Sequence, residues 1–116
     1  MVVGRYRLVS HGTYKEDNFF PTSSFLQGEL IYSYDGYLSV LIFFKQTVTS
    51  EKDFLAYTGT FEQISESEIL HKISLCSQSK RNGTVESRTF KESGNRIFLG
   101  VEMGDERFEA VWERES

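Results

Sequence analysis

The sequence predicts an all-β protein in which eight antiparallel strands close into one up-and-down barrel. Three observations lead to this fold class. Aromatic residues are spread along the 116-residue chain, which has nine glycines but only one proline, and this composition is typical of strands joined by glycine-containing turns. Apolar and polar residues alternate in several segments, as they do in strands with one buried face. Most links between the segments are short, and short links force neighbouring strands to be antiparallel.

The predicted strands follow one another without a linker or a repeat, so we expect one domain over residues 1–116. They are residues 4–11, 28–33, 37–44, 54–64, 69–77, 84–91, 96–101 and 107–114. In the fifth strand, alternation places four residues on the inner face, namely Ile69, His71, Ile73 and Leu75. The same alternation places Cys76 on the outer face.

Turn residues separate most of these strands. Asp35 and Gly36 form the clearest hairpin signal, because both central residues of a type I′ turn need a positive φ. Gly83, Gly94 and Gly104 mark three further reversals. Closure into a barrel removes exposed strand edges, whereas a sandwich of two sheets is the alternative architecture. A capping-box pattern at residues 50–53 is the one place where a helical turn fits.

Loop lengths distinguish the two ends of the predicted barrel. The two longest links, residues 12–27 and 45–53, lie at the same end, whereas the links at the other end are all tight. Because loops move and carry function, a mouth is expected at the loop end. Phe19, Phe20 and Phe25 in the first long link either form a lid over this mouth or simply plug it.

Composition and charge exclude several classes of protein. The net charge is −4 and the basic residues are scattered, whereas a nucleic-acid surface needs clustered lysine and arginine. No nucleic-acid partner is therefore expected. Cys76 is the only cysteine and cannot form an intrachain disulfide. The chain opens without an apolar leader, and its longest apolar run, residues 40–44, is too short to cross a bilayer. We therefore expect a cytoplasmic protein without a membrane partner.

Other kinds of chemistry lack the residues that they require. Neither of the two histidines has a nucleophile motif around it. Two distant histidines and one cysteine do not make a metal site, and the glycines lie in turns rather than in a phosphate-binding loop. We expect no metal and no cofactor, and the sequence assigns no catalytic residue.

Several stretches resemble a family of small bacterial and fungal lipocalin-like domain proteins. Residues 4–10 (GRYRLVS) resemble the family's opening G-x-W-x-L-V-S, with Tyr6 in place of the tryptophan. Residues 28–40 (GELIYSYDGYLSV) are similar to its G-x-L-I-Y-x-x-D-G-Y-M-S-V block. Residues 56–61, His71 and residues 112–114 resemble its later landmarks in the same order, so the resemblance spans nearly the whole chain.

The resemblance implies an eight-stranded barrel of the lipocalin-like, or calycin, type. Lipocalins at large carry small hydrophobic molecules, and a few fungal relatives of this barrel type sit in biosynthetic pathways and guide cyclisations. In lipocalins the residues matching Tyr6 and Arg114 stack on each other, so we expect the Arg114 guanidinium over the Tyr6 ring at the closed end. Fold alone does not determine function.

Two residues of the fourth and fifth predicted strands are candidates for the interior of the barrel. His71 faces inward by alternation. It is either a satisfied core histidine or a proton donor or acceptor for a ligand, because an ordinary histidine pKa of about 6.5 is easily tuned. Tyr57, expected near the mouth, can add a hydroxyl group to the same site.

Arg88 and Glu86 complete the candidate set. Both share the face of Phe90 in the sixth predicted strand. A short preceding link places Arg88 opposite Ile73 or Ser74, and hence diagonal to the inward histidine. A buried arginine needs a partner, which is either Glu86 in a structural ion pair or a ligand carboxylate or enolate.

Three functions are compatible with these residues. The leading hypothesis is the binding of a small, mostly apolar molecule with a polar or anionic group, held by Tyr57, His71, Arg88 and Glu86. The first alternative is an isomerase or cyclase with His71 as acid or base and Arg88 steadying negative charge. The second is a filled barrel that acts through its surface, which a cavity below about 300 Å³ favours. The sequence leaves the oligomeric state open.

Overall fold

The structure is a computed structural model that describes residues 2–22, 26–45 and 53–115. Phe25 and residues 50–52 of the expected helical turn lie outside the described residues. Within this part of the chain, no helix has the length and apolar character needed to span a membrane.

The described residues form nine strands and one short 3₁₀ helix. The strands are β1 (Gly4–Lys15), β2 (Asn18–Pro21), β3 (Gln27–Tyr32), β4 (Tyr37–Phe44), β5 (Asp53–Ser65), β6 (Glu68–Cys76), β7 (Val85–Ser93), β8 (Arg96–Met103) and β9 (Glu106–Arg114). The 3₁₀ helix η1 (Ser79–Arg81) lies between β6 and β7. All eight predicted strands are present, and β2 is additional.

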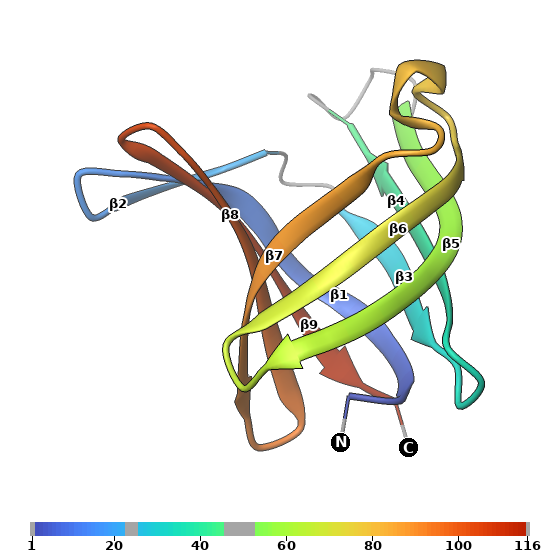
Figure 1. The fold of residues 1–116 in the computed structure, drawn as a ribbon. Coiled ribbons are helices and arrows are strands. Elements are labelled where there is room, and N and C mark those ends of the chain that lie inside the picture. Colours follow the sequence, from blue (N-terminus) through green and yellow to red (C-terminus); the bar gives the residue numbers. More distant parts are fainter. Residues whose placement is uncertain (1, 23–25, 46–52, 116) are drawn as a thin grey trace.

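The sheet closes into a barrel because β1 pairs with β9. Apart from β2, neighbouring strands run antiparallel in chain order from β1 through β3 to β9 (Figure 1). The closing pairing extends from Tyr6 opposite Arg114 to Lys15 opposite Glu106. The predicted eight-stranded antiparallel barrel is therefore confirmed, and the two-sheet sandwich is excluded.

The extra strand β2 pairs with the far end of β1, along Gly12 to Lys15. It follows a turn of Glu16 and Asp17, whose φ angles are 52° and 67°. Positive φ at both positions is typical of a type I′ hairpin, but neither residue is the asparagine or glycine by which such a turn is usually recognised. The prediction of a loop from residue 12 to residue 27 is therefore wrong for this hairpin.

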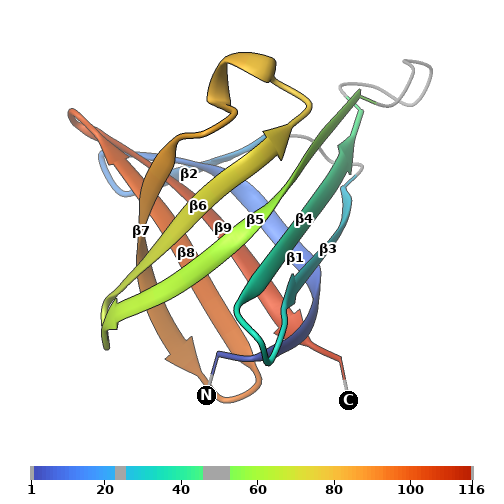
Figure 2. The ribbon, with the colours of Figure 1, turned by 45° about the vertical axis from the view of Figure 1, so that its right-hand side comes forward.

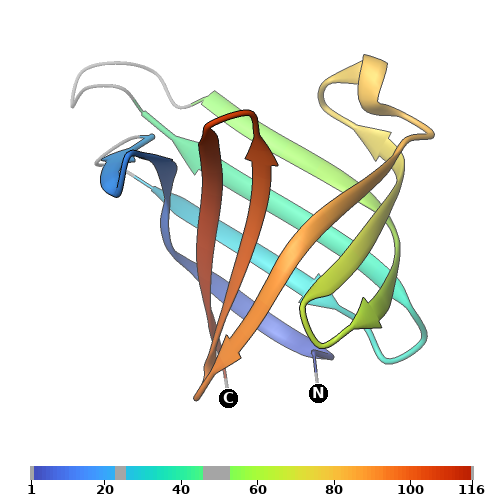
Figure 3. The ribbon, with the colours of Figure 1, turned by 60° about the vertical axis from the view of Figure 1, so that its left-hand side comes forward.

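The two ends of the barrel differ, as the loop lengths predicted. Both termini lie at the same end as the tight turns β3–β4, β5–β6 and β7–β8 (Figure 2). The helix η1, the β8–β9 turn and the tip of the β1–β2 hairpin lie toward the opposite end (Figure 3). One end is thus formed by short turns alone, and the other carries the longer β6–β7 connection with η1 as well as two short turns.

The predicted contact between Tyr6 and Arg114 is confirmed at the closed end. The Arg114 guanidinium lies 4.9 Å from the centre of the Tyr6 ring and also donates a 2.7 Å hydrogen bond to its hydroxyl. The Tyr6 hydroxyl donates to the carbonyl of Val2, and Arg114 donates to the carbonyl of Val3. These bonds attach the N-terminal residues to the base of the barrel.

A β-bulge overturns one part of the predicted alternation in β6. Ile73 lies opposite Gly59 but Leu75 lies opposite Thr58, so Ser74 is the additional residue of the bulge. One extra residue reverses the faces of all that follow it. Leu75, expected inside, is 67% exposed, while Cys76, expected outside, packs half-buried against the core.

The hairpin predicted at Asp35 and Gly36 is present, but its loop has three residues rather than two. The Gly36 N–H donates to the Ser33 carbonyl, and Ser33 pairs with Tyr37. Within the loop of residues 34–36, only Gly36 has a positive φ, of 94°. This is the arrangement of a tight turn followed by one left-handed residue, which also favours glycine.

Replacing Gly36 by valine should lower the free energy of unfolding by about 1 kcal/mol or more, because a β-branched residue resists a positive φ. A side chain at this position meets no atom within 4 Å, so the loss reports backbone conformation and not a clash. Urea denaturation measures it, with Gly36→Asn as the control because asparagine tolerates the left-handed region. Equal stabilities of the valine variant and the wild type would contradict the turn assignment.

Candidate functional site

The interior of the barrel contains a cavity of about 680 Å³. Ligand pockets usually measure about 300–1,000 Å³, so the barrel has space for a small molecule. Most of the wall is apolar and includes Leu30, Val40, Ile42, Leu99 and Trp112. The Nε1 atom of Trp112 is buried and makes no hydrogen bond within the described residues.

All four predicted site residues line this cavity. Tyr57 lies on β5, His71 on β6, and Glu86 and Arg88 on β7. His71 is only 1% exposed. The inward orientation predicted from alternation is therefore confirmed, while a role of these residues in ligand binding stays a prediction.

The register between β6 and β7 differs from the expected one. Arg88 lies opposite Ile69, not opposite Ile73 or Ser74, and Glu86 lies opposite His71. The link that contains η1 is longer than expected, because the pairing between the two strands ends with Lys72 opposite Val85. Ile69 and Ile73 lie on the same face of β6, so a partner of Ile69 keeps the inward face expected for a partner of Ile73, as Arg88 does.

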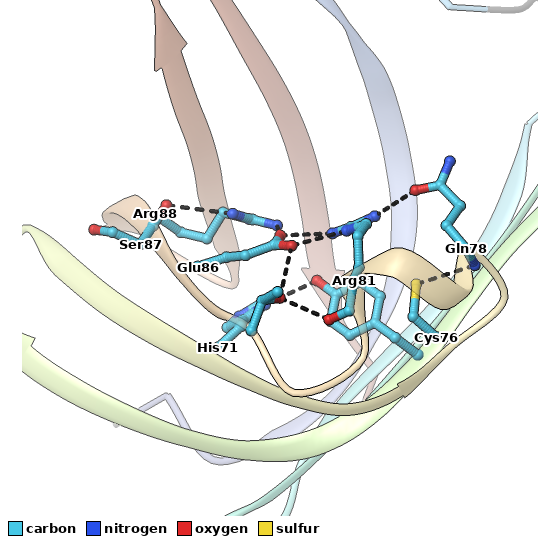
Figure 4. A network of polar contacts seen from close by, with 9 residues as sticks. His71, Cys76, Gln78, Arg81, Glu86, Ser87 and Arg88 are labelled. Carbon is cyan, nitrogen blue, oxygen red and sulfur yellow. Dashed lines mark hydrogen bonds and ion pairs between the residues drawn. The ribbon is translucent and has the colours of Figure 1, made fainter.

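Glu86 lies between two arginines and forms an ion pair with each of them (Figure 4). Arg81 donates to both carboxylate oxygens, with distances of 2.8 Å from Nε and 2.6 Å from Nη2. Arg88 donates to Oε1 at 2.5 Å. The hydrogen bonds from Arg81, followed by those from Arg88 and the charges of both groups, outweigh partial burial and lower the pKa of Glu86 to about 2.

Sequence reasoning missed Arg81. It lies in a link between two predicted strands, where no alternation indicates a direction, but in the structure it belongs to η1 and lines the cavity. The guanidinium lies 5.3 Å from the centre of the Tyr57 ring, in the range of a cation–π contact. The inward glutamate two residues into the next strand was the one available signal that a cation was needed nearby.

His71 lies between two tyrosine hydroxyls. Its Nε2 atom is 2.6 Å from the Tyr32 hydroxyl and its Nδ1 atom is 2.8 Å from the Tyr57 hydroxyl. Burial, reinforced by the positive charge of Arg88, lowers the pKa of His71 to about 3. The imidazole is therefore neutral near pH 7. Sequence reasoning also missed Tyr32, which is fully buried below the cavity wall.

The first long link contributes less to the site than expected. Phe19 and Phe20 lie on β2, where their exposed fractions are 38% and 55%, and neither lines the cavity. The Phe19 ring instead packs against Tyr14, with ring centres 5.0 Å apart. Neither of these two residues is positioned as a lid or as a plug.

The described residues hold no group of three histidine, cysteine, aspartate or glutamate side chains placed to bind a metal ion. Comparison of the chain with protein-family models and with curated proteins found no match. The function must therefore be argued from the cavity and from the polar groups on its wall.

Proposed function

We propose that the barrel binds a small, mostly apolar molecule carrying one anionic group, and that the anion contacts Arg81 and Arg88. The observation that supports this proposal most is a cluster of charged side chains in a mostly apolar cavity. The guanidinium groups of Arg81 and Arg88 share the carboxylate of Glu86. Arg88 and Arg81 have side chains only 14% and 21% exposed. Partly buried cations without full compensation are costly, and a ligand anion offsets that cost.

The rest of the cavity wall supports the apolar part of the proposal. Apolar side chains from β3, β4, β8 and β9 line the cavity together with the charged groups of β7 and η1. Glu109 on β9 also lines the cavity, but no hydrogen bond or ion pair joins it to Arg81 or Arg88 within the described residues. The resemblance to lipocalin-like proteins agrees with this proposal, because lipocalins carry apolar molecules.

The geometry favours binding over the two alternatives. Both ring nitrogens of His71 are engaged by tyrosines, and a pKa of about 3 is far from the value near 7 that suits a general acid or base. This argues against an isomerase or cyclase built on His71. A volume of about 680 Å³ argues against a barrel filled by its own side chains.

Two matched fluorescent probes test the proposal. 8-Anilinonaphthalene-1-sulfonate carries a sulfonate, whereas N-phenyl-1-naphthylamine is the same apolar skeleton without it. Arg88→Met should weaken binding of the sulfonate more than tenfold, because losing a desolvated charge partner costs about 2–5 kcal/mol, and should leave the neutral probe nearly unchanged. Glu86 keeps Arg81 as a partner in this variant, so the fold should persist.

Arg5→Met is the matched control, since the Arg5 side chain is 61% exposed on the outer wall. It should bind both probes as the wild type does. Equal affinity of the wild type for the two probes, or equal effects of the two arginine variants, would contradict the anionic part of the proposal. Failure of the wild type to bind either probe would contradict a ligand cavity.

A further inference from the structure

The direction of the hydrogen bonds around His71 follows from the surroundings of Tyr32. The Tyr32 side chain is fully buried, and its ring packs against the rings of Tyr6 and Phe61. Within the described residues its hydroxyl has one hydrogen-bond partner, Nε2 of His71. A buried O–H without an acceptor is costly, so Tyr32 must donate its hydrogen to Nε2.

The tautomer of His71 is then determined. A neutral imidazole has one N–H donor and one acceptor nitrogen. Because Nε2 accepts from Tyr32, the hydrogen is on Nδ1. The Nδ1 atom is 2.8 Å from the Tyr57 hydroxyl oxygen, and His71 therefore donates to Tyr57.

The Tyr57 hydroxyl accepts this hydrogen bond at its oxygen and keeps one hydrogen of its own to donate. No acceptor for the phenol hydrogen is found on the described residues, and Tyr57 lines the cavity.

We propose that His71 is a positioning residue that holds the Tyr57 hydroxyl as a hydrogen-bond donor toward the cavity, where it bonds an anionic oxygen of the ligand, as in a carboxylate. This inference rests on the proposed function and makes it more specific. The ligand oxygen lies between the Tyr57 hydroxyl and the two guanidinium groups. Tyr57 keeps its proton when the anion binds, because burial raises its pKa.

Nitrogen NMR of the ligand-free protein tests the tautomer without any ligand. The chain has two histidines, and the signals of His71 are those lost in His71→Asn. We expect His71 to carry its hydrogen on Nδ1 from pH 8 to pH 5. Removing the Tyr32 hydroxyl, which lies outside the cavity lining, by Tyr32→Phe should leave the hydrogen on Nδ1, because an Nε2–H would then have no acceptor, and should move the Nε2 chemical shift to that of a nitrogen that accepts no hydrogen bond. An Nε2–H tautomer in the wild type, or no change of the Nε2 chemical shift in Tyr32→Phe, would overturn the inference.

Binding of the two fluorescent probes tests whether the Tyr57 hydroxyl contacts the ligand anion. Tyr57→Phe should weaken 8-anilinonaphthalene-1-sulfonate about tenfold or more and leave N-phenyl-1-naphthylamine unchanged. His71→Asn, whose amide nitrogen can replace Nδ1, should retain more sulfonate affinity than His71→Gln, whose amide nitrogen lies nearer the position of Nε2. Equal affinity in these two variants, or an unaffected Tyr57→Phe, would overturn the positioning role.

The two experiments separate this inference from the proposed function. A wrong tautomer with intact, Arg88-dependent sulfonate binding refutes the inference and leaves the proposed function standing. If the wild type binds the two probes with equal affinity, the proposed function is refuted. The ligand contact of Tyr57 is then refuted with it, whatever the tautomer of His71.

Discussion

Replacing Glu86 with glutamine should lower the free energy of unfolding by about 2–4 kcal/mol at pH 7 and should tighten binding of 8-anilinonaphthalene-1-sulfonate. Glu86 is the shared anion of Arg81 and Arg88, and removing one partner of a largely buried charge cluster leaves the other charges uncompensated. The Glu86 side chain is 21% exposed, so the loss should fall below that of a fully buried pair. The guanidinium groups of Arg81 and Arg88, which no longer face a negative charge at position 86, then attract the sulfonate more strongly.

Urea denaturation and fluorescence titration measure the two effects. Glu62→Gln is the matched control, because Glu62 pairs with Lys72 on the outer wall with a side chain 55% exposed; such pairs contribute about 0–1 kcal/mol. If Glu86→Gln were as stable as this control, the cluster would not hold the barrel together. If it bound the sulfonate more weakly than the wild type, Arg81 and Arg88 would not be the anion site.

Acidification should destabilise the protein already below pH 6.5, mainly through His71. Its pKa is about 3 in the folded state and about 6.5 when unfolded. Between these values the unfolded chain binds more protons, so stability falls as the pH decreases, by up to about 1.4 kcal/mol per pH unit. Arg88 and Arg81 disfavour protonation of His71 and Glu86 favours it, but burial has the largest effect.

Two further groups shape the acid response. Burial also lowers the pKa of His11, which adds to the slope in the same direction. Glu86, with a pKa of about 2 against about 4.3 when unfolded, is depressed, so its contribution is lost only as the pH falls from about 4.5 toward 2. Of these three groups, only the two histidines contribute to measurements between pH 7.5 and pH 5.

Denaturation curves of the wild type, His71→Asn and His11→Asn over this interval separate the two histidines. The His71 variant should be less stable at pH 7, because Tyr32 loses its hydrogen-bond acceptor, but its stability should decrease much less on acidification. His11→Asn should keep most of the slope. A wild-type stability that does not change from pH 7.5 to pH 5 would show that His71 is not held neutral by burial.

Three differences between expectation and structure have local physical causes. The β1–β2 hairpin was missed because Glu16 and Asp17 adopt positive φ without glycine. The exposure of Leu75 was missed because a bulge depends on pairing with the neighbouring strand, which the pattern of one strand does not contain. Arg81 was missed because a residue in a link has no alternation from which its direction can be inferred.

The sequence by itself determined the barrel, its closed end and the inward faces of His71, Glu86 and Arg88. These follow from period-two alternation and from short turns, which are local properties of the chain. The tertiary structure alone decided that Glu86 is shared by Arg81 and Arg88, and that His71 lies between Tyr32 and Tyr57. Such contacts join β3, β5, β6, η1 and β7 across the barrel, and their geometry depends on registers and link lengths that only the folded chain sets.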